Sequence, residues 1–293
     1  WAAAPRGVPE QWSRTTVTPS RHTRFPGALA TTALLLALLL GGCTGGPSAE
    51  QLYARATQRA FECDFEDALD LTERCLEREP DHVQALILHG YCHYRLMTPE
   101  QMLRDSSTVV DLMRQAADLA KDDFLAQYYL GWMLFEAGQY GQALAPLERA
   151  YALRAQCPDR DDSVLVMLSM CCVNQNLVRG RTYLQALRRF PGFERSPLVY
   201  NALGVLNAKQ RDYQDALGSF MEALRRDPNN AVVLQNLAVL FDERLQHPDE
   251  AMRYYARAIA ARQVMRDSTR QDEMRRRLRQ LSVERRRPVN GRR

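Results

Sequence analysis

The sequence predicts an all-α protein, a solenoid of about six helical hairpins followed by a capping helix. A pattern of small, aromatic and apolar residues recurs about every 34 residues between positions 49 and 264. Past this region, Met274, Leu278 and Leu281 follow the i, i+4, i+7 spacing of an amphipathic helix. The apolar fraction of 46% excludes a chain that is disordered throughout, and 7 cysteines in 293 residues are too few for a disulfide scaffold.

Residues 1–42 are expected to be a signal peptide rather than part of the fold. Basic residues up to Arg24 precede an apolar run of about 13 residues that ends at Leu40. That run is too short to cross a bilayer, which requires about 20 residues, and it is typical of the hydrophobic region of a secretory signal. The chain opens with Trp1 and has no methionine before Met97, so initiation at Val17 would give a leader of about 26 residues.

The segment Leu40-Gly41-Gly42-Cys43 resembles the lipobox of bacterial lipoproteins. The resemblance implies cleavage before Cys43 and lipidation of its sulfur and amino group, with residues 43–48 as the lipidated cysteine and a short tether. Thr44 follows the cysteine where an aspartate would favour the inner membrane, so the resemblance implies the outer membrane. The alternatives are a plain secreted signal with a chance cysteine and a buried N-terminal helix.

The repeat is clearest at residues 197–230. Its characteristic positions are Gly204, Tyr213, Ala216, Phe220, Ala223 and Pro228. This unit resembles a tetratricopeptide repeat (TPR), which implies two antiparallel helices that cross at Gly204 and Ala216 and a right-handed stack of such units. The proline stops the second helix because it cannot continue the backbone hydrogen bonding.

The same spacing divides the solenoid, residues 49–264, into units at about 49–82, 83–123, 124–157, 160–194, 197–230 and 231–264. The second unit carries an insertion of about seven residues around Thr98–Ser107, and the sixth has one extra residue in the turn Gln246-His247-Pro248. The unit 160–194 is helical by period but lacks the small residues, and we interpret it as a degenerate repeat. Residues 265–293 are expected to form the capping helix and a basic tail.

Charge is distributed unevenly along the chain. The formal net charge of +4 combines about +3 in the leader, about −7 in residues 43–261 and about +8 in residues 262–293. The Arg-rich tail is either a solvated capping helix or a strip that contacts an anionic surface: lipid headgroups, an acidic glycan or an acidic protein. Nucleic acid is not expected as a partner, because the leader directs export.

In the repeat architecture that the resemblance implies, the first helix of each unit lines the concave face. Its inward positions in the front half are Tyr53, Thr57, Ile87, Tyr91, Tyr94, Tyr128, Trp132 and Phe135. Tyrosine and tryptophan dominate the energetics of many interfaces, so these residues are the candidate groove for a partner peptide. The alternative is that the rings pack on neighbouring helices as ordinary core.

Catalytic motifs are not found in the sequence: it has no phosphate-binding loop, no G-x-S-x-G and no H-E-x-x-H. His89 and His93 share a helical face and are weak candidates for a metal site with a third ligand from elsewhere, although packing is the simpler interpretation. Cys171-Cys172 suggests either a redox pair or core packing, and the six cysteines after Cys43 allow one or two disulfides. No cofactor is expected.

These patterns together predict a non-catalytic scaffold that binds peptides or helices of cell-envelope proteins. A lipid on Cys43 would hold it at the periplasmic face of the bacterial outer membrane. The alternatives are a cytoplasmic TPR module of the chaperone type, if the leader is mis-assigned, and a metal-binding protein that uses His89 and His93.

Overall fold

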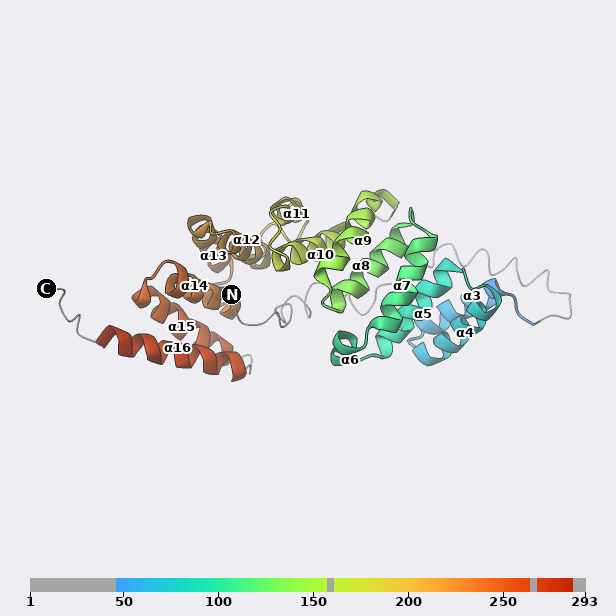
Figure 1. Ribbon diagram of the computed structural model, residues 1–293, viewed down its shortest axis with the longest axis horizontal. Helices are drawn as coiled ribbons and strands as arrows, with labels where there is room; N and C mark the ends of the chain where they lie inside the picture. The colour runs from blue at the N-terminus through green and yellow to red at the C-terminus, as the bar shows by residue number, and fades with distance from the viewer. Residues whose placement is uncertain (1–45, 157–160, 264–267, 287–293) are drawn as a thin grey trace. The chain divides into compact units, whose positions relative to one another are not determined.

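The computed structural model describes residues 46–156, 161–263 and 268–286, and every regular element in these ranges is helical (Figure 1). The chain divides into two compact units, Trp1–Cys171 and Cys172–Arg293, which are described separately. The leader and Cys43 lie outside the described residues. Within the described ranges, no helix is both long and apolar enough to cross a bilayer.

The first unit is built of paired helices. α3 packs against α4, α5 against α7, and α8 against α9, and α5 also contacts α3 and α8. The elements are α3 (Ala49–Phe61), α4 (Phe65–Arg78), α5 (Val83–Leu96), α6 (Pro99–Arg104), α7 (Ser107–Leu119), α8 (Phe124–Glu136), α9 (Tyr140–Ala152) and the 3₁₀ turn η1 (Arg154–Gln156). α10 (Asp161–Asn174) runs across the boundary between the two units.

The second unit continues the same pairing. α11 contacts α12, α12 packs against α13, α14 against α15, and α15 against α16. The elements are α11 (Gly180–Leu187), α12 (Pro197–Lys209), α13 (Tyr213–Arg226), α14 (Ala231–Val239), the π-helical segment η3 (Leu240–Arg244), α15 (Pro248–Gln263) and α16 (Ser268–Arg286). The all-α fold of stacked hairpins predicted from the sequence is confirmed.

The two helices of a hairpin cross where one of them carries glycine. A methyl group added at Gly204 would lie 2.5 Å from the Phe220 ring, and one at Gly131 would lie 2.6 Å from the Leu147 side chain. Real side-chain contacts do not approach this closely, so a residue with a Cβ would push the helices apart. The prediction that Gly204 marks a close crossing is confirmed.

The turn inside most hairpins contains one residue with a left-handed backbone. Cys63, Gly138, Asn176 and Arg211 have φ between 56° and 72°, and each lies just past the end of a first helix. The following amide then donates to a carbonyl five residues back, for example Asp64 to Arg59 and Asp212 to Asn207. This Schellman arrangement satisfies carbonyl groups that the helix end leaves free.

Two irregularities of the repeat have a defined structure. The insertion around Thr98–Ser107 forms the short helix α6, with a capping box at Thr98 and a buried Met102. The extra residue of the sixth unit is not confined to the turn at Gln246-His247-Pro248, which corrects that expectation. The helix accommodates the extra residue before the turn, because η3 is a π-helix with one more residue per turn. The amide of His247 then donates a hydrogen bond to the carbonyl of Phe241.

The C-terminal helix α16 docks on the second unit through its apolar stripe. Met274 and Leu281 are buried, and Leu278 packs against the same core, as the spacing predicts. Arg277 adds a bidentate ion pair in which Nε and one terminal nitrogen donate to the two oxygens of Asp242, each at 2.7 Å. Because Asp242 lies on η3, the π-helical segment fixes one attachment point of the capping helix.

Candidate partner-binding site

Aromatic rings from α5 and α8 form one cluster in the first unit, which we call the aromatic cluster: Tyr91, Tyr94, Tyr128, Tyr129 and Trp132. The Trp132 ring is the common neighbour, with ring centroids 5.3 Å from Tyr94, 5.7 Å from Tyr129 and 6.2 Å from both Tyr91 and Tyr128. These edge-on and tilted geometries are the favourable ones for aromatic pairs. The cluster therefore ties the first helices of two successive repeats together.

The eight residues expected to line a groove divide into two sets. Five of them are only 2–7% exposed, so the structure corrects the expectation of an open groove at Ile87, Tyr91, Tyr128, Trp132 and Phe135. Their side chains pack on neighbouring helices, and the rings of Tyr91, Tyr128 and Trp132 meet because the first helices α5 and α8 lie close together. Tyr53, Thr57 and Tyr94 keep partial exposure and are the positions that a partner could contact directly.

Two of these accessible residues lie on α3 and are held by local contacts. The Thr57 hydroxyl donates to the Tyr53 carbonyl at 2.9 Å, and the Tyr53 ring lies 5.0 Å from the ring of His82. Burial is the main cause that raises the pKa of Tyr53, so its hydroxyl stays protonated. At this end of the unit the surface therefore offers neutral hydroxyl groups.

A carboxylate that was not singled out in the sequence lies at the edge of the aromatic cluster. Glu136 accepts a hydrogen bond from Trp132 Nε1 at 3.2 Å, and the Tyr94 hydroxyl hydrogen-bonds the same carboxyl group. Burial raises the pKa of Glu136, and the two hydrogen bonds act in the opposite direction. The spacing Trp132–Glu136 (i, i+4) places both side chains on one helical face and is the signal that could have identified Glu136.

The rings of His89 and His93 pack against each other on α5. Their rings meet edge to face with centroids 4.9 Å apart, and Thr72 Oγ1 lies 2.7 Å from His89 Nδ1. Burial and the neighbouring His93 lower the pKa of His89 to about 4, so the ring is neutral at pH 7. Among the described residues, no three histidine, cysteine or acidic side chains are grouped so that they could hold a metal.

Cys63, Cys75 and Cys92 are free thiols, so the expectation of disulfides finds no support at these three positions. Cys75, Cys92, Cys171 and Cys172 are buried, and Cys63 is exposed in the α3–α4 turn. Burial raises the pKa of Cys92 to about 12, which leaves its thiol protonated and unreactive. Cys157 and Cys43 lie outside the described residues.

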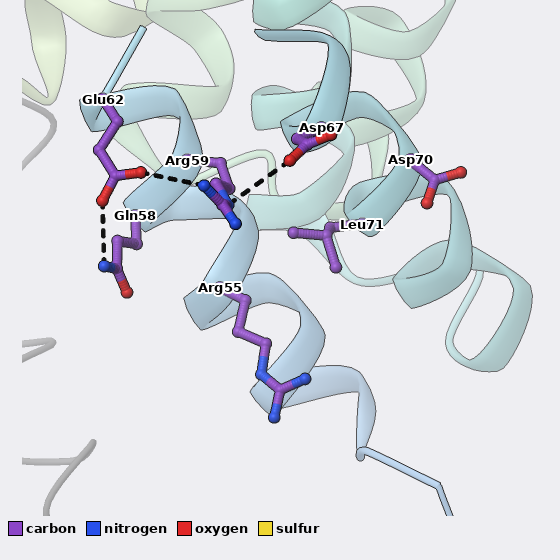
Figure 2. Close-up of a pocket in the computed structure, with 7 residues that line it drawn as sticks. All are labelled: Arg55, Gln58, Arg59, Glu62, Asp67, Asp70 and Leu71. Atoms are coloured by element: carbon purple, nitrogen blue, oxygen red, sulfur yellow. Dashed lines mark hydrogen bonds and ion pairs between the residues drawn. The ribbon is translucent and has the colours of Figure 1, made fainter. Parts of the chain in front are cut away.

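A shallow polar pocket lies over α3 and α4 (Figure 2). Arg59 makes ion pairs with Glu62 at 3.3 Å and Asp67 at 3.6 Å, and Gln58 donates to Glu62 at 3.1 Å. The remaining lining residues are Arg55, Asp70 and Leu71. Most charges in this pocket therefore compensate one another, and exposed pairs of this kind contribute little.

Two segments match models of the tetratricopeptide repeat, residues 197–230 and residues 110–160. The fold is an all-α TPR solenoid. Proteins of this class serve as scaffolds for protein–protein interactions. Comparison with curated proteins by sequence finds no match.

Several solved structures share this fold. YrrB, described as a TPR protein with an unusual peptide-binding site, is 19% identical, with 70% of this chain and 95% of that chain covered at a TM-score of 0.56. PilW, described as a widely conserved type IV pilus biogenesis factor, is 15% identical over 77% and 97% of the two chains at a TM-score of 0.55. PilF of Pseudomonas aeruginosa is 16% identical over 78% and 97% at a TM-score of 0.52.

Proposed function

We propose that this protein is a non-catalytic, membrane-anchored scaffold that binds peptides or helices of protein partners in the bacterial cell envelope. The observation that carries the proposal is a TPR solenoid whose first helix starts a few residues after the lipobox-like cysteine in the sequence. Stacked hairpins supply an extended surface for partners, and the cysteine supplies an attachment to a membrane.

The start of α3 supports a close association with the membrane. Ser48 closes a capping box with Gln51, so the folded part begins five residues after Cys43. Five extended residues span at most about 18 Å. The side chain of Arg78 also donates to the carbonyls of Pro47 and Gly46, so the tether is held against the end of α4 from residue 46 onward.

The similar structures agree with such a role, although identities below 20% establish the fold alone. The YrrB description names a peptide-binding site, and the PilW description names type IV pilus biogenesis. For this chain we propose a partner peptide held along the first helices. We place the protein at the periplasmic face of the outer membrane because Thr44 follows the cysteine. The Arg-rich α16, on which Arg276 and Arg279 are exposed, could add contact with an anionic surface.

Partner binding is tested by photo-crosslinking. A photoreactive phenylalanine analogue replaces Tyr94, which is partly exposed on a first helix, and a matched variant carries it at the exposed Thr108 on α7. Crosslinks to a defined protein from position 94 and not from 108 would support binding along the first helices. Equal recovery from both positions, or none from 94, would refute it. Trp132 and Tyr91 are unsuitable because replacing buried rings would disturb folding.

Anchoring is tested separately by replacing Cys43. Cys43→Ser is expected to abolish palmitate labelling and to move the protein from the membrane fraction to the soluble fraction, while Cys63→Ser, at an exposed thiol, should change neither. Unchanged labelling in Cys43→Ser would contradict Cys43 as the lipidated residue, and no labelling of the wild type would favour the cytoplasmic alternative.

A further inference from the structure

Glu136 is a carboxylate at the edge of the aromatic cluster, with no cation paired to it in the part of the chain that the structure describes. Its two hydrogen-bond donors, Trp132 and Tyr94, are neutral. Among the described residues Glu136 takes part in no ion pair, because Arg95, the cation next to Tyr94, is engaged elsewhere: its guanidinium lies 4.4 Å over the Phe65 ring and donates to the Tyr91 hydroxyl. A carboxylate held out of water without a cation is unfavourable for folding.

The surroundings of Glu136 are those that a positive ligand prefers. Aromatic faces attract cations, tryptophan most strongly, and Trp132 and Tyr94 meet at 5.3 Å beside the carboxyl group. Glu136 and Tyr94 both keep partial exposure, so a side chain from another molecule can reach this edge of the cluster. Carboxylate and ring faces together favour an ammonium or guanidinium group over a neutral or acidic one.

We propose that Glu136, Tyr94 and Trp132 form a recognition site for a basic side chain, lysine or arginine, of the partner peptide. This inference rests on the proposed function, since it names the chemistry of a ligand bound along the first helices. The acidic balance of about −7 in residues 43–261 would attract a basic segment toward the same region. In this site Glu136 supplies the charge, while Tyr94 and Trp132 position the carboxylate and cover the cation.

The site is tested with small analogues of the two side chains. The full chain has 3 tryptophans, and Trp1→Phe with Trp12→Phe leaves Trp132 as the one tryptophan, whose emission is excited selectively. n-Butylammonium and n-butylguanidinium chloride are titrated at constant ionic strength, with n-butanol as the neutral control. A saturable change in Trp132 emission with either cation, and none with n-butanol, is expected.

Glu136→Gln separates a charge role from a structural one. The glutamine can still accept hydrogen bonds from Trp132 and Tyr94, so the helices should stay in place while affinity for the cations falls at least tenfold. Glu66→Gln, at an exposed acid on α4, is the matched control and should bind as the wild type does. Equal affinity in Glu136→Gln, or no saturable change in the wild type, would overturn the inference.

The cation titration tests this site whether or not a partner protein is found by crosslinking. Cation binding without any crosslink from position 94 would support this site and contradict the proposed scaffold. Crosslinks from position 94 without cation binding would support the scaffold and show that its partner is not held by a basic side chain.

Discussion

Replacing Arg277 with alanine is expected to detach the capping helix α16 from the second unit. The Asp242 side chain is only 3% exposed and accepts three hydrogen bonds, two from Arg277 at 2.7 Å and one from the Tyr255 hydroxyl at 3.2 Å. Alanine removes two of the three and leaves a buried carboxylate without a cation. Burial of an uncompensated charge is among the most destabilising single changes in a protein.

The magnitude follows from the geometry of the pair. Removing one partner of a buried ion pair destabilises by about 3–5 kcal/mol. The Arg277 side chain is 37% exposed, and Tyr255 still donates to the carboxylate, so we expect about 2–3 kcal/mol, below the range for a fully buried pair. Because repeats are stabilised chiefly by their neighbours, the loss should be concentrated in α16 and in the α14–α15 hairpin.

Amide hydrogen exchange measured by mass spectrometry, together with urea unfolding, distinguishes local detachment from global unfolding. Exchange in α16 should accelerate strongly in Arg277→Ala while α12 and α13 keep most of their protection. Arg276→Ala, one residue away and exposed, is the matched control and should change stability by less than about 0.5 kcal/mol. Identical exchange in the two variants would refute the assignment of Arg277 as the attachment point.

Three further predictions concern backbone and protonation. Gly204→Ala should destabilise the fold by about 1–3 kcal/mol because the added methyl group meets Phe220. Gly218→Ala, where the added methyl group meets open space, should stabilise it by up to about 1 kcal/mol. Equal effects of the two variants in urea unfolding would contradict the close crossing at Gly204. Arg211→Gly should stabilise by about 1 kcal/mol by relieving the left-handed backbone, and a lower thermal midpoint would argue against it. The free energy of unfolding should fall as pH drops from about 6.5 to about 4, because His89 is then protonated in the unfolded chain and not in the folded one. His89→Gln should flatten this part of the plot of stability against pH. An unchanged plot would show that His89 does not cause the pH dependence.

The repeat itself was predictable from the sequence because close helix crossings leave a composition signature. Gly131 and Gly204 tolerate no Cβ, and Phe220 fills the space that glycine leaves. These constraints recur at a fixed spacing, so several matches that are individually weak together predict the repeat fold. The apolar stripe of α16 was predictable for the same reason, since Met274 and Leu281 lie on one helical face.

Other features depend on energies that local patterns do not contain. An added residue can extend a turn or widen a helix, and the spacing before Pro248 is the same in both cases, so the π-helical η3 could not be predicted. The pairing of Asp242 with Arg277 joins residues 35 positions apart and has no short-range signal. The sequence likewise could not show whether the front rings are groove or core.

That last ambiguity has a physical origin. Tyrosine and tryptophan are favoured in cores and in interfaces alike, because both environments reward large rings with one polar atom. Charge is more discriminating than ring content, since a core does not favour a carboxylate without a cation. The position five residues after the crossing glycine shows this. Arg95 occupies it after Gly90 and donates to the Tyr91 hydroxyl. Lys209 occupies it after Gly204 and donates to the carbonyl of Val173. Glu136 occupies the same position after Gly131 with two neutral donors and, among the described residues, no ion pair, which is the observation behind the proposed site for a basic side chain.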